Sequence, residues 1–129
     1  MINLRETEIR NLGTELVLKA YQAEMSAKME GIALPDNLLD LAFTVSSTVA
    51  EAFSALSDLD YERQLVLSVQ SVETIARQLH LSDTGSRKHW MSALEFTNQQ
   101  LHMELEECLL EFHNISLEDY SPQLEKACI

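Results

Sequence analysis

The stretch of sequence that decides the fold of this chain is Ala42-Phe43-Thr44-Val45-Ser46-Ser47-Thr48-Val49-Ala50-Glu51-Ala52. Its apolar residues recur three and four positions apart, a spacing that places them on one face of an α-helix. Several of them are small, so a second helix can approach closely there. Glu51 is flanked by apolar residues and is expected to need a cation from another helix. The candidates are Lys19, Arg63 and Arg77.

The first of four helical patterns covers residues 4–30, where apolar residues again recur at helical spacing. Gly13-Thr14 interrupts this pattern, and Thr14 is a suitable N-terminal cap for a helix that begins there. Residues 1–13 would then form a separate N-terminal arm. Gly31 is well placed to end the helix, because glycine adopts the left-handed backbone of a C-terminal cap without strain.

Three further helical patterns follow along the chain. The second comes after Pro35-Asp36, since proline and an acidic residue both favour the first turn of a helix, and it is expected to end near Leu56. The third begins after residues 57–60, which offer serine and aspartate caps, and a turn is expected at residues 82–86. The fourth ends before residues 114–129, which show little periodicity and are expected to form a C-terminal tail.

Four helices joined by short loops pack as an antiparallel up-and-down bundle, so we predict an all-α fold with residues 1–113 in one four-helix bundle. The length of 129 residues suits a single domain, and 46 % hydrophobic residues supply a core. Some apolar residues fall outside the main stripes, and a second buried face used for self-association is favoured over scattered surface residues. These residues are Leu18, Met25, Phe43, Val66, Leu67, Met91, Phe96, Met103 and Leu110.

The charge of the chain is strongly negative, with 21 acidic and 9 basic residues and a net charge of −12. Residues 31–57 contain no Lys or Arg, and Lys126 is the only basic residue in 91–129. Direct RNA binding is therefore not expected, because neutralised phosphates supply most of the affinity for nucleic acids. A solvated acidic face is the plainer interpretation, and a basic protein partner is compatible with it. The candidate contacts of such a partner are Glu104, Glu107 and Glu111.

The location expected from the sequence is cytoplasmic. No apolar run is long enough to span a membrane, and the charged N-terminus is not typical of a secretory signal. Cys108 lies in a helical pattern and Cys128 lies next to the end of the chain. Two such cysteines do not form a disulfide framework, which agrees with a reducing compartment.

The sequence contains few patterns that carry chemistry. It has no Glu-x-x-His repeat of a di-iron bundle, no glycine-rich phosphate loop and no recognisable Ser-His-Asp grouping. His102 and Glu106 lie one turn apart and could bind a metal weakly, with His113 roughly on the same face, but solvent-facing polarity is favoured. Cys108 falls on the apolar stripe, which predicts an inert core thiol rather than a nucleophile. We therefore predict no enzymatic activity, no cofactor and no metal site.

Two of the expected helices resemble a known family pattern. Residues 42–52 are similar to Ala-x-Ser-Ile-x-x-Asn-Ile-Ala-Glu-Gly, which marks the four-helix-bundle family first noted in intervening sequences of bacterial large-subunit ribosomal RNA. Residues 68–75 are similar to the pattern Ala-x-Gly-Ser-Leu-x-Glu-Leu of the family's next helix. Residues 39–41 hold no basic residue, although related proteins often have one there. The packing positions that the resemblance singles out are Ala42, Val45, Val49, Ala50, Glu51 and Ser71.

The resemblance implies a role as well as a fold. The family includes the accessory variability determinant (Avd) of diversity-generating retroelements, a pentameric ring that partners a reverse transcriptase and RNA. The implied function is a non-catalytic, ring-forming homo-oligomer that serves as an accessory subunit of such an enzyme. The alternative is a stand-alone member of the intervening-sequence family with an unassigned role, for which a connection to nucleic acid stays open. A small bundle enzyme or metal carrier is the third class.

Overall fold

All regular structure in the described part of the chain is helical. The structure, a computed structural model, describes the backbone of residues 4–81 and 88–128 and the side chains as far as Asn114. Within these residues there are four helices and no strand: α1 (Leu4–Glu30), α2 (Leu38–Phe53), α3 (Asp58–Leu81) and α4 (His89–Cys128). The predicted all-α class with four helices is confirmed. The turn expected at residues 82–86 lies outside the described residues.

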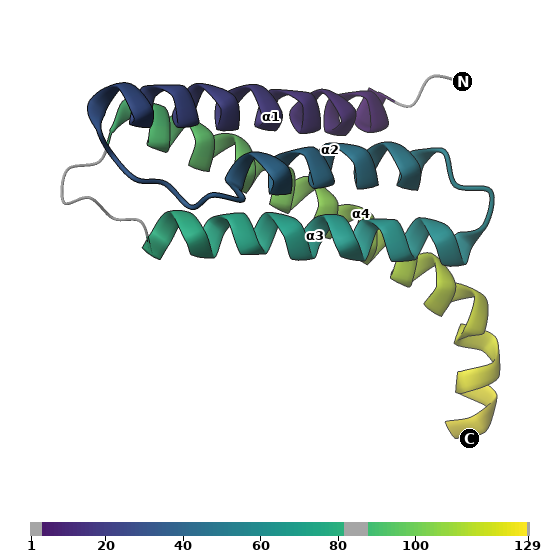
Figure 1. Ribbon diagram of the computed structural model, residues 1–129. Helices are drawn as coiled ribbons and strands as arrows, with labels where there is room; N and C mark the ends of the chain where they lie inside the picture. Colours follow the sequence, from purple (N-terminus) through teal and green to yellow (C-terminus); the bar gives the residue numbers. More distant parts are fainter. Residues whose placement is uncertain (1–3, 82–87, 129) are drawn as a thin grey trace.

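Each helix packs against two others around one core. Helix α1 contacts α2 and α4, and α3 contacts the same two helices from the other side (Figure 1). Apolar side chains at helical spacing on all four helices meet inside, as the stripes predict. The largest fully buried ones are Ile9, Leu16, Val45, Val49, Leu65, Val72, Ile75, Leu79, Met91, Leu94, Leu101 and Leu105.

The helix α1 runs unbroken through Gly13, so the predicted interruption at Gly13-Thr14 is wrong. Ile9 is fully buried in the common core, and the first turns of α1 therefore pack with the bundle rather than forming a separate arm. Gly13 is buried where α1 passes α2: a Cβ atom built on it would lie 3.4 Å from Ser46 Cα. The glycine permits close packing of two helices and does not end a helix.

Helix α1 ends as the sequence predicts. Gly31 has φ +70°, and its N–H donates to the Lys28 carbonyl at 3.3 Å. The N–H of Ile32 donates to the Ala27 carbonyl at 2.8 Å. These two bonds are the pair of a Schellman motif, which needs a left-handed residue and so favours glycine.

The bounds of α2 and α3 differ in detail from the expected ones. Helix α2 begins at Leu38, beyond Pro35-Asp36, and ends at Phe53, so Leu56 lies outside the helix and is fully exposed. The predicted serine cap of α3 is confirmed, since Ser57 Oγ accepts a hydrogen bond from the Asp60 N–H at 3.1 Å.

Helix α4 is longer than the sequence predicts. It spans 40 residues, about 60 Å at the usual rise of a helix, and Figure 1 shows its C-terminal part extending beyond the other three helices. The expected tail at 114–129 is therefore helical as far as Cys128. Met91, which was expected outside the buried stripe, is buried in the first turn of α4.

Polar contacts also cross between helices inside the core. The Thr48 and Ser68 hydroxyl oxygens lie 2.6 Å apart and join α2 to α3. Asn98 Nδ2 donates to the Val72 carbonyl at 3.0 Å and joins α4 to α3. Because buried polar groups are costly without partners, these bonds favour one register of the helices over others.

Candidate interaction surfaces

The positions that the family pattern singles out divide between the core and the surface. Ala42, Val45 and Val49 are buried on the face of α2 that packs against α1 and α3. Ala50 and Ser71 are partly buried.

Glu51 is exposed, although the sequence predicts a cation beside it. Arg63 pairs with Asp60 at 3.8 Å, and Arg77 donates to the Thr74 hydroxyl at 3.1 Å. Among the described side chains, no ion pair of Glu51 is found. Its exposure removes the need for a partner, because water solvates the carboxylate.

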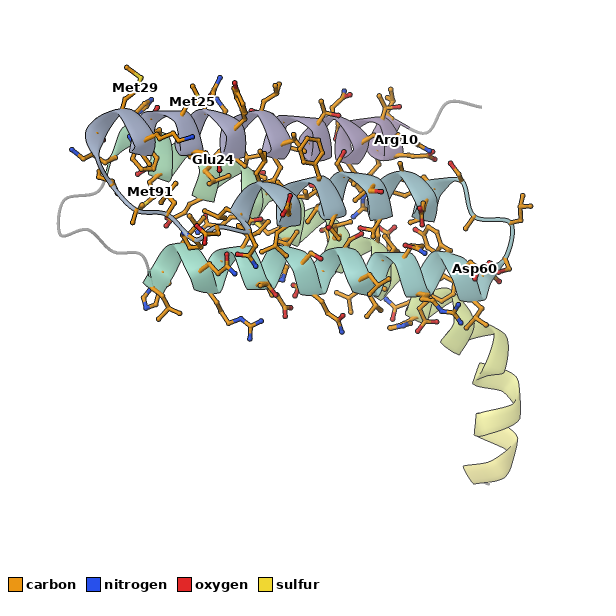
Figure 2. The ribbon with its side chains drawn as sticks, viewed as in Figure 1. Arg10, Glu24, Met25, Met29, Asp60 and Met91 are labelled. Atoms are coloured by element: carbon orange, nitrogen blue, oxygen red, sulfur yellow. The ribbon has the colours of Figure 1, made fainter. Side chains whose placement is uncertain are left out.

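A first apolar stripe runs along the outer face of α1. Its side chains are exposed, and Figure 2 shows Met25 and Met29 directed away from the other helices. The members recur at helical spacing, so they share one face of α1 opposite to the buried one. They are Leu18, Tyr21, Met25 and Met29, and we call them the α1 stripe.

A second apolar stripe lies on α4. Phe96, Met103 and Leu110 are 63 %, 62 % and 60 % exposed, and each follows the last by seven residues. A seven-residue repeat keeps side chains on one side of a helix over several turns, as in helices that pair with one another. We call these three residues the α4 stripe. Of the other residues predicted to lie outside the core, Phe43 and Leu67 are also exposed, whereas Val66 is partly buried.

The three carboxylates predicted to meet a basic partner converge on Arg5. Arg5 Nη2 lies 2.7 Å from Glu107 Oε2, Arg5 Nε lies 3.4 Å from Glu104 Oε2, and Nη1 pairs with Glu111. The hydrogen bond to Glu111 raises the pKa of Arg5. Three carboxylates against one guanidinium leave this end of the α1–α4 surface with a net negative charge, and Glu107 and Glu111 are mostly exposed.

Tyr61 and Cys108 lie beside this cluster. Burial raises the pKa of Tyr61 to about 12, with Cys108 as a further cause. Burial also raises the pKa of the Cys108 thiol, opposed in part by the Arg5 charge. A thiol with a raised pKa stays protonated near neutral pH and is a poor nucleophile. The arrangement therefore favours the structural interpretation of Cys108 that the sequence suggests.

The two histidines considered as ligands have separate surroundings. His113 Nε2 lies 3.4 Å from Glu62 Oε1 on α3. His102 lies beside Glu106 and also beside Glu73 of α3, which the sequence did not single out. The two histidines are about 16 Å apart along the helix, so they do not share one site.

Arg5→Gln is expected to lower the thermal midpoint by a few degrees at low salt, since an exposed ion pair contributes up to about 1 kcal/mol and three carboxylates would lose their cation. In 1 M salt the difference should largely disappear, because the remaining repulsion is screened. Thermal melts at both salt concentrations measure this. Arg63→Gln, which loses only the exposed Asp60 contact, is the control and should change little. An equal loss for Arg5→Gln at both salt concentrations would mean that Arg5 acts through packing.

Comparisons of the chain with protein-family models, with curated proteins and with solved structures found no match. The resemblance to the intervening-sequence family therefore depends on the residue patterns of α2 and α3 alone. None of the helices, over the described residues, is both long and apolar enough to cross a membrane.

Proposed function

We propose that this protein is a non-catalytic helical scaffold: an antiparallel up-and-down four-helix bundle that self-associates and serves as an adaptor for a larger protein. The observation that carries the proposal is the presence of two exposed apolar stripes, on α1 and on α4, in addition to a complete core. A monomer seldom exposes apolar residues in contiguous rows, and such rows mark protein contacts.

Contacts at both ends of the helices support the antiparallel arrangement. Arg5 near the start of α1 meets Glu111 far along α4, and Glu30 at the end of α1 accepts a hydrogen bond from Trp90 at the start of α4. Helix α3 relates to α4 in the same way, since Glu62 near its start lies beside His113. Short connections between successive helices favour the same topology.

The α4 stripe is suited to pairing with a helix of another copy. Its members occupy one position of a seven-residue repeat, and the large side chains of Phe96, Met103 and Leu110 would bury apolar area in such a contact. The α1 stripe provides a second contact on a different helix. Two different contact surfaces on one chain allow a closed ring, in which each copy meets two neighbours through unlike surfaces.

The adaptor part of the proposal depends on charge and on the family resemblance. The carboxylates around Arg5 and the net charge of −12 suit a basic protein surface as partner. The resemblance of residues 42–52 to the intervening-sequence family points to the accessory subunit of a diversity-generating reverse transcriptase, which forms a pentamer. The proposed location of the present chain is the cytoplasm. A basic reverse transcriptase would then bind against Glu104, Glu107 and Glu111, and this contact should weaken as salt rises.

Self-association is expected at micromolar concentration. Light scattering on the purified chain should give a multiple of 14.6 kDa, with five copies for the proposed ring. The double variant Phe96→Glu, Met103→Glu should shift the mass to the monomer, because it places charge in the apolar contact. Ser47→Glu, an exposed position on α2, adds a charge on a helix that does not contact α4 and is the control. A wild-type mass of 14.6 kDa would exclude the scaffold.

Binding to bare RNA at physiological salt is expected to be weak or absent. The negative charge repels phosphate, and a ring multiplies that charge. A fluorescence titration against structured and single-stranded RNA measures this, with the double variant Glu107→Lys, Glu111→Lys as a control that should bind more tightly. Sub-micromolar, salt-sensitive binding by the wild-type chain would instead support the stand-alone, nucleic-acid-related role.

A further inference from the structure

A mixed group of ligand-type side chains lies between α3 and α4, on the surface of the bundle. His102 Nε2 is 3.0 Å from Glu106 Oε1, one turn along α4, and 3.5 Å from Glu73 Oε1 on α3. One ligand atom of each residue lies within 4.8 Å of those of the other two. The imidazole therefore faces two carboxylates that come from different helices.

The ring nitrogen Nε2 of His102 lies beside two carboxylates but forms no hydrogen bond with either of them. Although the side chain is about one-third exposed, the Nε2 atom is hidden from solvent and, among the described residues, has no hydrogen-bond partner. Glu106 Oε1 and Glu73 Oε1 lie 3.0 and 3.5 Å from this nitrogen as ion-pair contacts. A hidden polar atom without a partner costs free energy, so its position next to two carboxylates calls for a further group between them.

We propose that Glu73, His102 and Glu106 bind a divalent transition-metal ion, for which Zn²⁺ is the best fit. Zinc binds histidine nitrogen and carboxylate oxygen at about 2.0–2.2 Å, so ligand atoms around a tetrahedral ion are about 3.4 Å apart. The two measured nitrogen–oxygen distances, 3.0 and 3.5 Å, are close to this value. The third separation needs only a small movement of the partly exposed Glu73 or Glu106 side chain.

The donor set agrees with this choice of ion. Two carboxylates and a neutral imidazole together balance a charge of 2+, and imidazole favours Zn²⁺, Ni²⁺ or Cu²⁺ over Mg²⁺ and Ca²⁺. Three protein ligands leave one position for water. The side chains of Glu73 and Glu106 are about half exposed, so an ion can enter from solvent.

The proposed site would act as a link between two helices. It joins α3 to α4 through Glu73 and His102. The Arg5 cluster lies on another side of α4, where α4 packs against α1. An ion that binds the folded chain and not the unfolded one raises stability in proportion to its affinity. The site is independent of the proposed scaffold function, because none of its residues belongs to the α1 or α4 stripe.

Titration of the full chain, without any affinity tag, with Zn²⁺ in a calorimeter tests the site. We expect one ion per chain, a rise in thermal midpoint, and visible absorption of tetrahedral type when Co²⁺ replaces Zn²⁺. His102→Ala and Glu73→Gln should each weaken binding by about tenfold or more, since one of three ligands is lost. His113→Ala, which removes a histidine beside a single carboxylate, is the control and should bind as the wild type does.

Two results would overturn the proposal: no stoichiometric binding of Zn²⁺ or Co²⁺, or equal affinity in the wild-type and His102→Ala proteins. Circular dichroism shows whether each variant keeps its helices, and Glu106→Gln provides a second variant if His102→Ala does not fold. The oligomer mass is measured separately on the same samples. A monomer that binds zinc would disprove the scaffold proposal and support the metal site. An oligomer that does not bind zinc would disprove the metal site and support the scaffold proposal.

Discussion

Leu101→Ala is expected to lower the free energy of unfolding by about 2–5 kcal/mol, because it removes a fully buried side chain and leaves a cavity in the core. Leu101 lies about a third of the way along α4, and its side chain has no exposed surface. The surrounding residues come from rigid helices, so the cavity can close only in part. Urea unfolding followed by circular dichroism measures the loss. For a domain of this size it is a large fraction of the total stability.

The control is Leu81→Ala at the end of α3. Leu81 is 83 % exposed and belongs to neither apolar stripe, so the same chemical change should alter stability by less than about 0.5 kcal/mol. Comparable losses for the two variants would mean that the bundle does not pack around Leu101 as described.

The helices could be predicted from sequence because their signals are local. Apolar residues three and four apart define the buried face of α2 and α3, and Gly31 and Ser57 mark helix ends through contacts within a few residues. The same local reasoning failed at Gly13. A glycine within a helical pattern has the same appearance whether it ends a helix or admits another helix, and only the position of α2 decides between them.

The ion pairs on the surface form between different helices, and the sequence does not predict which helices lie side by side. The sequence predicts Glu104, Glu107 and Glu111 as an acidic face of one helix, but the cation that they surround is Arg5, about a hundred positions earlier in the chain. The three glutamates recur at helical spacing, so the sequence predicts that they share one helix face and one cation. It does not say which cation that is.

The same limit applies to the proposed metal site. His102 and Glu106 are one turn apart and could be found in the sequence, whereas Glu73 joins them only through the register of α3 against α4. Asn98, which lies one turn before His102 on α4, contributes to that register. Its side-chain amide donates a hydrogen bond to the Val72 carbonyl of α3, next to Glu73. A third ligand from another helix cannot be recognised before this alignment is known.

Gly13→Leu is expected to destabilise the bundle by roughly 1–3 kcal/mol, because the added carbons would press α1 away from α2. A Cβ atom at residue 13 already lies 3.4 Å from Ser46 Cα, 3.7 Å from Ser46 Oγ and 3.8 Å from Ser46 Cβ. The nearest of these atoms belongs to the backbone and cannot rotate aside. A larger side chain must therefore leave its preferred rotamer or separate the two helices.

Gly13→Ala is the matched variant and should have the opposite effect. Its single carbon fits at ordinary van der Waals distance from Ser46, and alanine in a helix interior is favoured over glycine by about 1 kcal/mol. Thermal and urea unfolding of both variants beside the wild type measure the two effects. If α1 and α2 pack closely at residue 13, Gly13→Ala should leave stability unchanged or raise it, and Gly13→Leu should lower it. If leucine were tolerated as well as alanine, residue 13 would face open space, and the helix interruption predicted from the sequence would become the better explanation of this glycine.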